Sequence, residues 1–195
     1  MITIRQACAS DGEQAVSLLM TAAGPLLTRI FGSGSDERAR AFLGDSWNRA
    51  TGQYGFENHW VAEIDHTVCG LVTAWHSALP EGFDRATLDA ITAHFGLDEA
   101  LDVVLRSQRY SASLQPPKAS ELAVGHLAVS QDVRRQGIAS ALMQAMDELA
   151  RSLKKQYLVL DVEQRNQTAV AFYCQLGFEQ TALTPPFLHL QKRLA

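Results

Sequence analysis

A short basic turn between residues 134 and 139 has the residue types and spacing to bind an anion. It reads Arg134-Arg135-Gln136-Gly137-Ile138-Ala139 and follows an apolar, β-prone stretch, residues 122–129. After it, apolar residues recur at helical spacing at Ile138, Ala141, Leu142, Ala145 and Leu149. Backbone amides left open at the positive end of a helix dipole suit a pyrophosphate. An ordinary strand-to-helix turn with exposed arginines has the same pattern, so the turn alone does not decide the function.

A second stretch, residues 166–178, adds an amide and a phenol to this chemistry. It reads Asn166-Gln167-Thr168-Ala169-Val170-Ala171-Phe172-Tyr173-Cys174-Gln175-Leu176-Gly177-Phe178. Together with Leu127-Ala128-Val129 and the basic turn, it resembles the GNAT superfamily of acyl-CoA-dependent N-acetyltransferases. Members of that superfamily carry Leu-x-Val, then R/Q-x-x-G-x-G/A, and downstream N-x-x-A-x-x-F-Y-x-x-x-G-F. The resemblance is strong from about residue 120 onward, partial over residues 1–76 and absent over residues 77–118.

The resemblance implies that the chain binds acetyl-CoA as a cosubstrate and holds no metal. The pantetheine arm would lie along the backbone of residues 127–129, where this strand and the next one splay apart, and Asn166 would contact the pantetheine or cap its helix. Arg135 stands where many relatives have glycine, so the turn is more basic and bends differently. The implied cofactor-binding residues are Leu127, Ala128, Val129, Arg134, Arg135, Gln136, Gly137, Ile138, Ala139, Ser140, Asn166 and Tyr173.

Acetyl transfer to an amine requires a neutral amine, a polarised carbonyl and a proton for the leaving thiolate. By its place in the second block, Tyr173 is predicted to be the general acid, because a phenol with a pKa near ~10 is protonated at neutral pH. Glu121 and His126 are both candidates for the base, and water or a residue of the inserted helices is the alternative. Strict alternation separates Glu121 and His126, whereas a bulge at Gly125 would bring them to one face of the strand.

The fold class expected from the resemblance is α/β (α+β), with a mixed, mostly antiparallel sheet of six or seven strands and helices on both faces. The N-terminal pattern agrees, since residues 1–6 alternate like a strand and a capping box, Ser10 with Glu13, predicts a following helix. Gly24-Pro25 should kink that helix, and a second helix is expected over residues 36–49. Residues 60–64 and 68–75 should form a hairpin.

Residues 77–118 form a helical insert before the cofactor strand, inside what we expect to be a single domain over residues 1–195. Apolar spacing predicts two short helices, residues 86–95 and 98–109, separated by Gly96. The insert either covers an edge of the sheet or forms a lid or wall of the acceptor site. Its position between the hairpin and the cofactor strand is the argument for the wall.

The charge and residue composition limit the classes of partner and ligand that we expect for this protein. The net charge of -4 has the wrong sign for a nucleic-acid binder, and no apolar run resembles a signal peptide or membrane span, so we expect a cytoplasmic protein. Three isolated cysteines favour neither disulfides nor a zinc site, and three histidines near the hairpin, His59, His66 and His76, are expected to be exposed or structural. The acceptor is predicted to be a small-molecule amine ahead of a peptide or protein amine. A non-catalytic acyl-CoA-binding module is the rival, and a homodimer is left open.

Overall fold

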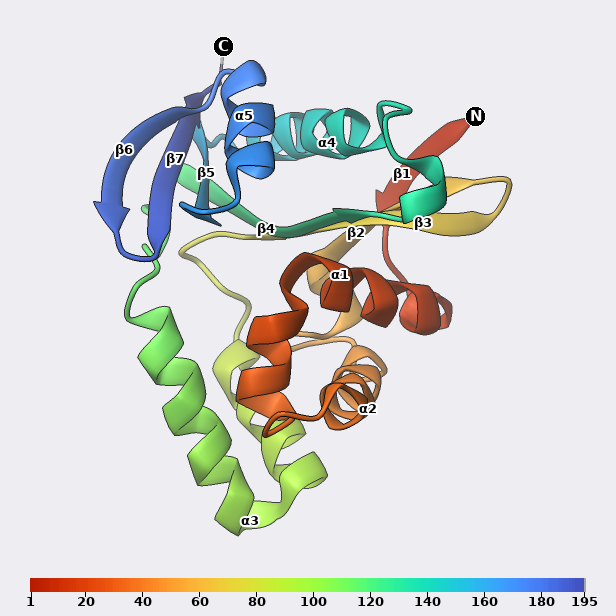
Figure 1. Cartoon of the computed structure of the whole chain (residues 1–195), viewed down its shortest axis with the longest axis vertical. Coiled ribbons are helices and arrows are strands. Elements are labelled where there is room, and N and C mark those ends of the chain that lie inside the picture. Colours follow the sequence, from red (N-terminus) through yellow and green to blue (C-terminus); the bar gives the residue numbers. More distant parts are fainter. Residues whose placement is uncertain (195) are drawn as a thin grey trace.

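Seven strands of this chain pair in one mixed sheet, which the computed structural model describes over residues 1–194 (Figure 1). The order is β1-β2-β3-β4-β5-β7-β6, and only β4 and β5 are parallel. The prediction of a mostly antiparallel sheet with helices on both faces is therefore confirmed. The strands are β1 Ile2–Gln6, β2 His59–Ile64, β3 Thr67–Trp75, β4 Glu121–Val129, β5 Tyr157–Glu163, β6 Glu179–Thr184 and β7 Phe187–Arg193.

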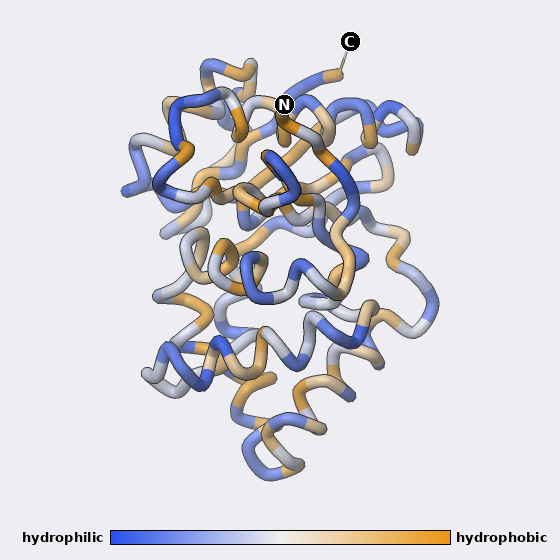
Figure 2. The backbone as a smooth tube through the Cα atoms, turned by 90° about the vertical axis from the view of Figure 1, so that its right-hand side faces the viewer, coloured by the Kyte–Doolittle hydropathy of each residue, from blue (hydrophilic) through white to orange (hydrophobic). Residues whose placement is uncertain are grey.

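The helices divide between the two faces of the sheet. Three of them, α1 Gly12–Phe31, α2 Asp36–Trp47 and α3 Phe83–Ser111, lie on one face, while α4 Ile138–Ser152 and α5 Gln167–Gln175 lie on the other. Each face has its own apolar core, the first around Trp47, Phe42 and Leu71 and the second around Leu122, Leu142 and Leu158. Figure 2 shows hydrophobic segments both in the sheet and in the helices that cover it. Burial of these two apolar faces holds the helices against the sheet.

Helix α1 bends where the sequence predicts a kink. Ala23 has non-helical angles, φ -142° and ψ 24°, two residues before Pro25. The segment Ala9–Phe31 is long and apolar enough to cross a membrane by length and composition, contrary to the expectation from sequence, but half of it is buried inside the structure. It contacts β3 and β4 on one side and α2 and α3 on another. These contacts are those of a core helix.

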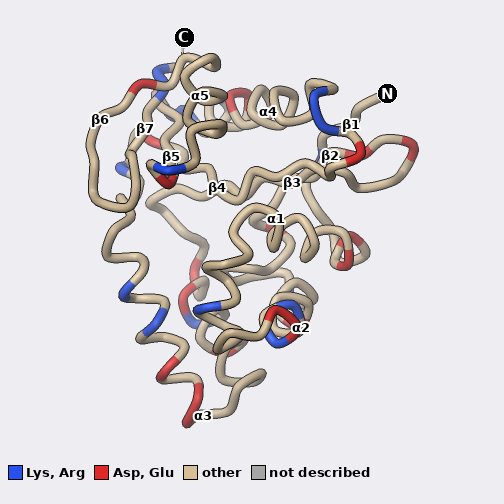
Figure 3. The backbone as a smooth tube through the Cα atoms, in the orientation of Figure 1, with Lys and Arg blue, Asp and Glu red and all other residues tan. Residues whose placement is uncertain are grey.

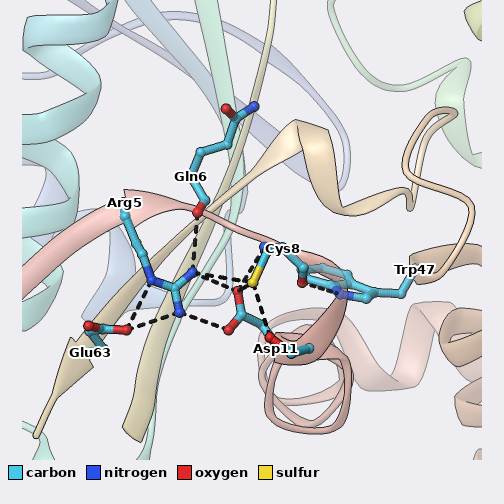
Figure 4. A network of polar contacts seen from close by, with 7 residues as sticks. Arg5, Gln6, Cys8, Asp11, Trp47 and Glu63 are labelled. Atoms are coloured by element: carbon cyan, nitrogen blue, oxygen red, sulfur yellow. Dashed lines mark hydrogen bonds and ion pairs between the residues drawn. The ribbon is translucent and has the colours of Figure 1, made fainter. Parts of the chain in front are cut away.

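The start of α1 differs from the predicted capping box. The helix begins at Gly12 after a short 3-10 turn, Ala9–Asp11, and no side chain caps it. Arg5 on β1 explains the difference, because its guanidinium donates to both oxygens of the Asp11 carboxylate at 2.8 Å and to Glu63 at 3.0 Å (Figure 4). Asp11 also accepts from the backbone amide of Cys8 at 2.8 Å. The long-range ion pair therefore sets the helix start in place of the local Ser10 motif.

Loss of the Arg5 guanidinium should destabilise the fold in a pH-dependent way. The hydrogen bonds from Arg5 lower the pKa of the Asp11 carboxyl, which is 5% exposed. Because the folded pKa is the lower one, this stabilisation is complete above pH ~4 and is lost as the pH falls through the folded value. We expect Arg5→Gln to cost about 1.5–3 kcal/mol at pH 7, from hydrogen bonds to a charged group, and less at pH 3.

Urea unfolding at both pH values measures this difference. Arg85→Gln is the control, since Arg85 contacts Asp89 only at 3.8 Å on an exposed helix surface and should change stability little at either pH. An Arg5→Gln cost that stayed the same from pH 7 to pH 3 would contradict the role of the Asp11 charge.

The insert is helical as predicted, with one break. Gly96 has φ 77° and ψ 168°, so α3 is two helices that meet at this residue. Glycine adopts these angles at no steric cost, whereas residues with a Cβ are essentially excluded from them. Gly96 therefore separates the two helices at the position that the sequence predicts.

Candidate active site

The turn before α4 presents a run of free backbone amides. No amide of residues 135–140 donates a hydrogen bond to another residue of the described chain, and the first helical bond runs from the amide of Ala141 to the carbonyl of Gly137 at 2.9 Å. Gly137 is the N-cap with φ 82° and ψ 1°, and Arg135 adopts φ 62° despite its side chain. The turn thus presents a run of unpaired donors at the positive end of α4.

Positive charge surrounds these amides. Arg134 and Arg135 are exposed, and a basic segment marks the start of α4 in Figure 3. The Nε of Arg134 donates to the carbonyl of Val129 at 3.2 Å, which holds the arginine over the end of β4. A Cβ built on Gly137 would meet no atom within 4 Å, so the space beside this residue of the turn is open. Donors, charge and open space fit a phosphate group.

A close contact fixes α4 against the sheet. A Cβ on Gly70 of β3 would lie 3.0 Å from Cγ2 of Ile138 and 3.1 Å from Cδ1 of Leu142. A side chain at this position would require the Ile138 and Leu142 side chains to move by a few tenths of an ångström. The first turn of α4 therefore packs closely on β3 at Gly70.

Strand β4 separates from β5 beyond its first residues. The two strands pair only from Glu121 with Tyr157 to Ala123 with Val159, although β4 continues to Val129. The backbone of residues 124–129 consequently has no strand partner on the β5 side. Such an edge can accept an extended ligand through main-chain hydrogen bonds. Leu127, Ala128 and Val129, the predicted cofactor-binding residues of this strand, lie along that edge.

The predicted bulge in β4 is present one residue later than expected. Thr73 pairs with Gly125 but Leu71 pairs with Ala128, so β4 has one extra residue, and His126 takes φ 49° within it. The Nδ1 atom of His126 lies 3.1 Å from Oγ1 of Thr73, and its ring centroid is 5.9 Å from that of Tyr54. Burial lowers the pKa of His126 to about 4, so the imidazole is neutral at pH 7.

Tyr173 lies on α5, in the core shared by α4, α5 and the sheet. Its ring contacts those of Phe172 and Phe178, with centroids 5.4 Å and 5.6 Å away. Burial raises the pKa of the phenol to about 12, and its hydroxyl has no hydrogen-bond partner among residues 1–194. The hydroxyl is therefore a protonated donor without an acceptor.

Glu121 sits at the other end of β4, where β4 and β5 are still paired. Its carboxylate accepts from the amide of Lys118 at 2.7 Å and from Nε2 of Gln191 at 3.1 Å, and its side chain is buried. Glu121 lies five positions before His126 in the strand, which is roughly 16 Å of extended chain. The structure does not bring these two predicted bases together at one point.

The remaining predicted residues lie near the strand gap or the turn. Asn166 caps α5, because its Oδ1 accepts from the amide of Ala169 at 3.2 Å. Ile138 is buried under the turn, whereas Gln136 and Ser140 are exposed beside it. In the described chain, no group of three or more histidine, cysteine, aspartate or glutamate side chains could hold a metal ion.

One polar residue that contacts His126, Thr73, was missed from the sequence. Thr73 on β3 and His59 on β2 are buried, and Nδ1 of His59 lies 2.9 Å from the same Thr73 hydroxyl that contacts His126. The sequence did identify His59 as a candidate structural histidine, but Thr73 lies in an apolar strand and gives no local signal. His66 is exposed in the hairpin turn and His76 follows β3.

Comparisons with known proteins agree with this geometry. A model described as the acetyltransferase (GNAT) family matches residues 33–178. No curated protein matches the chain. Among solved structures, one titled as an acetyltransferase has a TM-score of 0.74 at 22% identity, covering 99% of this chain and 100% of its own. An N-acetyltransferase from Staphylococcus aureus Mu50 has a TM-score of 0.69 at 17% identity, covering 98% and 99%.

A third similar structure is a complex with coenzyme A. The PaiA N-acetyltransferase from Thermoplasma acidophilum has a TM-score of 0.58 at 14% identity, covering 99% of each chain. At these identities the structures show a shared fold, while the family match spans most of the sequence. The chain therefore belongs to the acetyltransferase (GNAT) family and is an N-acetyltransferase that takes its acetyl group from acetyl-CoA.

Proposed function

We propose that the protein acetylates the primary amine of a small molecule by direct attack of the amine on the thioester of acetyl-CoA. The main support is that the open edge of β4, residues 124–129, leads to the free amides of residues 135–140. A ligand with a pyrophosphate at the turn and an extended arm along β4 matches both features. Its thioester end then lies toward the bulge at His126.

Tyr173 donates a hydrogen bond to the sulfur as the C–S bond breaks. The amine nitrogen forms a bond to the carbonyl carbon, and the thiolate of coenzyme A leaves with a negative charge. The raised pKa of Tyr173, about 12, keeps its proton on the oxygen. Since thiols have a pKa near ~8.5, the phenol stabilises the thiolate more by hydrogen bonding than by complete proton transfer.

Water takes the proton of the amine in this proposal. Glu121 is occupied by the amides of Lys118 and Gln191, and the pKa of His126, about 4, makes its imidazole a weak base. An imidazole of this pKa does not retain the proton at pH 7, so the proton that the amine releases passes to bulk solvent, which is held near pH 7. The amine therefore enters in its neutral form and loses its proton to solvent after the attack.

The position of the insert favours a small acceptor, because α3 contacts α1 and α2 as well as strand β7. Arg38 of α2 contacts Glu99 at 2.8 Å, and Nε of Arg106 donates to the carbonyl of Ile30 at 2.8 Å. Near the C-terminal end of α3, Tyr110 packs edge-on against Phe187 of β7, with ring centroids 5.3 Å apart. A helix held at three points between Glu99 and Tyr110 restricts access more than an open groove for a protein chain would.

A panel of amines tests this function. We expect coenzyme A release from acetyl-CoA to rise well above the amine-free rate with one or more small amines, such as polyamines, amino acids or aminoglycosides. Peptides with a free N-terminus should be poorer acceptors. Faster release with peptides would overturn the acceptor class. Tight acetyl-CoA binding without turnover on any amine would favour an acyl-CoA-binding module instead.

A further inference from the structure

Three side chains on adjacent strands form a buried hydrogen-bond chain next to the proposed site. His59 on β2 pairs directly with Thr73 on β3, and Thr73 pairs with Gly125, the residue before His126. The Thr73 hydroxyl lies 2.9 Å from Nδ1 of His59 and 3.1 Å from Nδ1 of His126. His59 is fully buried and Thr73 is 5% exposed.

Because the Thr73 hydroxyl has a single proton, the hydrogen bonds between His59, Thr73 and His126 must all run in one direction. Both imidazoles are neutral at pH 7, since burial lowers the pKa of His59 to about 3 and that of His126 to about 4. A neutral imidazole carries its proton on only one ring nitrogen. Thr73 can donate to one Nδ1 only, so the other Nδ1 must be an N–H that donates to Thr73.

The far nitrogen of His59 decides between the two directions. Its Nε2 atom is buried and has no hydrogen-bond partner in the described chain, and the Trp47 ring stacks on the imidazole at 4.9 Å. Orphaned N–H donors are rarer in folded proteins than orphaned acceptors. His59 therefore carries its proton on Nδ1 and donates to Thr73, and Thr73 in turn donates to Nδ1 of His126.

We infer that His59, acting through Thr73, holds the proton of His126 on Nε2, so that His126 presents an N–H donor to the carbonyl oxygen of the acetyl group. His126 is half-buried, and its Nε2 has no hydrogen-bond partner among residues 1–194. A fixed donor at the position where negative charge develops stabilises the transition state. This role rests on the proposed function, but the position of the proton does not.

The backbone supports a functional role for His126. A non-glycine residue at φ 49° costs conformational energy, and such residues persist where the surrounding structure holds them. The bulge turns the His126 side chain toward Thr73, on the face covered by α1 and α2. In this inference His126 donates the hydrogen bond to the acetyl carbonyl oxygen. His59 and Thr73 are positioning residues that act through His126.

Nitrogen-15 NMR of the free protein tests the direction of the chain. Long-range correlations should show protonated Nδ1 in His59 and protonated Nε2 in His126. Protonated Nδ1 in His126 would overturn the inference, whatever the protein does with amines. Conversely, absence of turnover with the expected proton positions would overturn the proposed function, and the donor role that rests on it, but not the direction of the hydrogen bonds.

Variants separate the donor from its positioning residues. His126→Gln keeps an N–H donor near Nε2 but has no basic nitrogen, so it should retain far more turnover than His126→Phe, for which we expect a loss of about 100-fold. Both variants share the strained backbone position. Equal loss in the two would contradict the donor role.

The positioning role needs a change that leaves His126 intact. Thr73→Val should lower kcat roughly tenfold, as expected for one neutral hydrogen bond, and shift the Nδ1 resonance of His126. Thr73→Ser keeps the hydroxyl and should restore both. Normal kcat and an unshifted resonance in Thr73→Val would contradict the inference.

Discussion

Gly137→Asp should weaken the binding of coenzyme A and acetyl-CoA by about 100-fold or more. The substitution places a carboxylate beside the free amides of residues 135–140, where it occupies the open space and repels phosphate. Loss of two charge-assisted hydrogen bonds, at about 1.5–3 kcal/mol each, accounts for at least this factor. Isothermal titration calorimetry at low salt measures the effect, since salt screens the repulsion.

The chain offers a closely matched control for backbone strain. Gly82 is the N-cap of α3 with φ 78° and ψ 2°, and a Cβ there also meets nothing within 4 Å. Gly82→Asp therefore imposes the same conformational cost at a helix N-terminus away from the proposed site, and it should leave affinity unchanged. Equal loss of affinity in both variants, or none in Gly137→Asp, would refute the phosphate site at this turn.

Tyr173→Phe should lower turnover about 100-fold while cofactor affinity changes little. The variant keeps the ring between Phe172 and Phe178 and removes only the hydroxyl, which has no partner among residues 1–194. A donor to the leaving thiolate acts mainly in the transition state, so the loss falls on kcat. Steady-state kinetics and calorimetry on one preparation give both values.

The melting temperature of Tyr173→Phe, measured beside its rate, distinguishes a role of Tyr173 as a donor from a role in packing. If Tyr173 were only a core aromatic, Phe would be nearly neutral in rate, because no buried group is left unpaired. The melting temperature should match wild type, which shows that any loss of rate is chemical. Tyr157→Phe is the control, since Tyr157 lies on β5 where β4 and β5 are still paired. A Tyr173→Phe enzyme with normal kcat would end the proposal for this residue.

Local sequence was sufficient for the turn, the helices and the kink, because each depends on residues close together in the chain. Gly96 and Pro25 act through their own backbone, and Asn166 caps a helix that starts at the next residue. The capping box at Ser10 failed for the opposite reason. Arg5 of β1, itself bonded to Glu63 of β2, holds Asp11 in the conformation that replaces it.

The surroundings of the candidate bases could not be predicted from sequence. Glu121 is bound by Gln191, a residue 70 positions away on β7. Thr73 meets both His59 and His126 only through the register of three strands and one extra residue in β4. Such pairings depend on long-range strand register, and a shift of one residue would turn each side chain to the other face.

The sheet consists of two parts, β1 to β4 and β5-β7-β6. Only the three residue pairs between β4 and β5 form the junction that joins them. A ligand that supplies main-chain hydrogen bonds along β4 completes this junction, so its binding and the folding of the chain are one linked equilibrium. At a concentration 100 times its Kd, a ligand that binds only the folded state adds about 2.7 kcal/mol to the free energy of unfolding. The supply of acetyl-CoA then sets the resistance of the enzyme to unfolding and proteolysis as well as its rate.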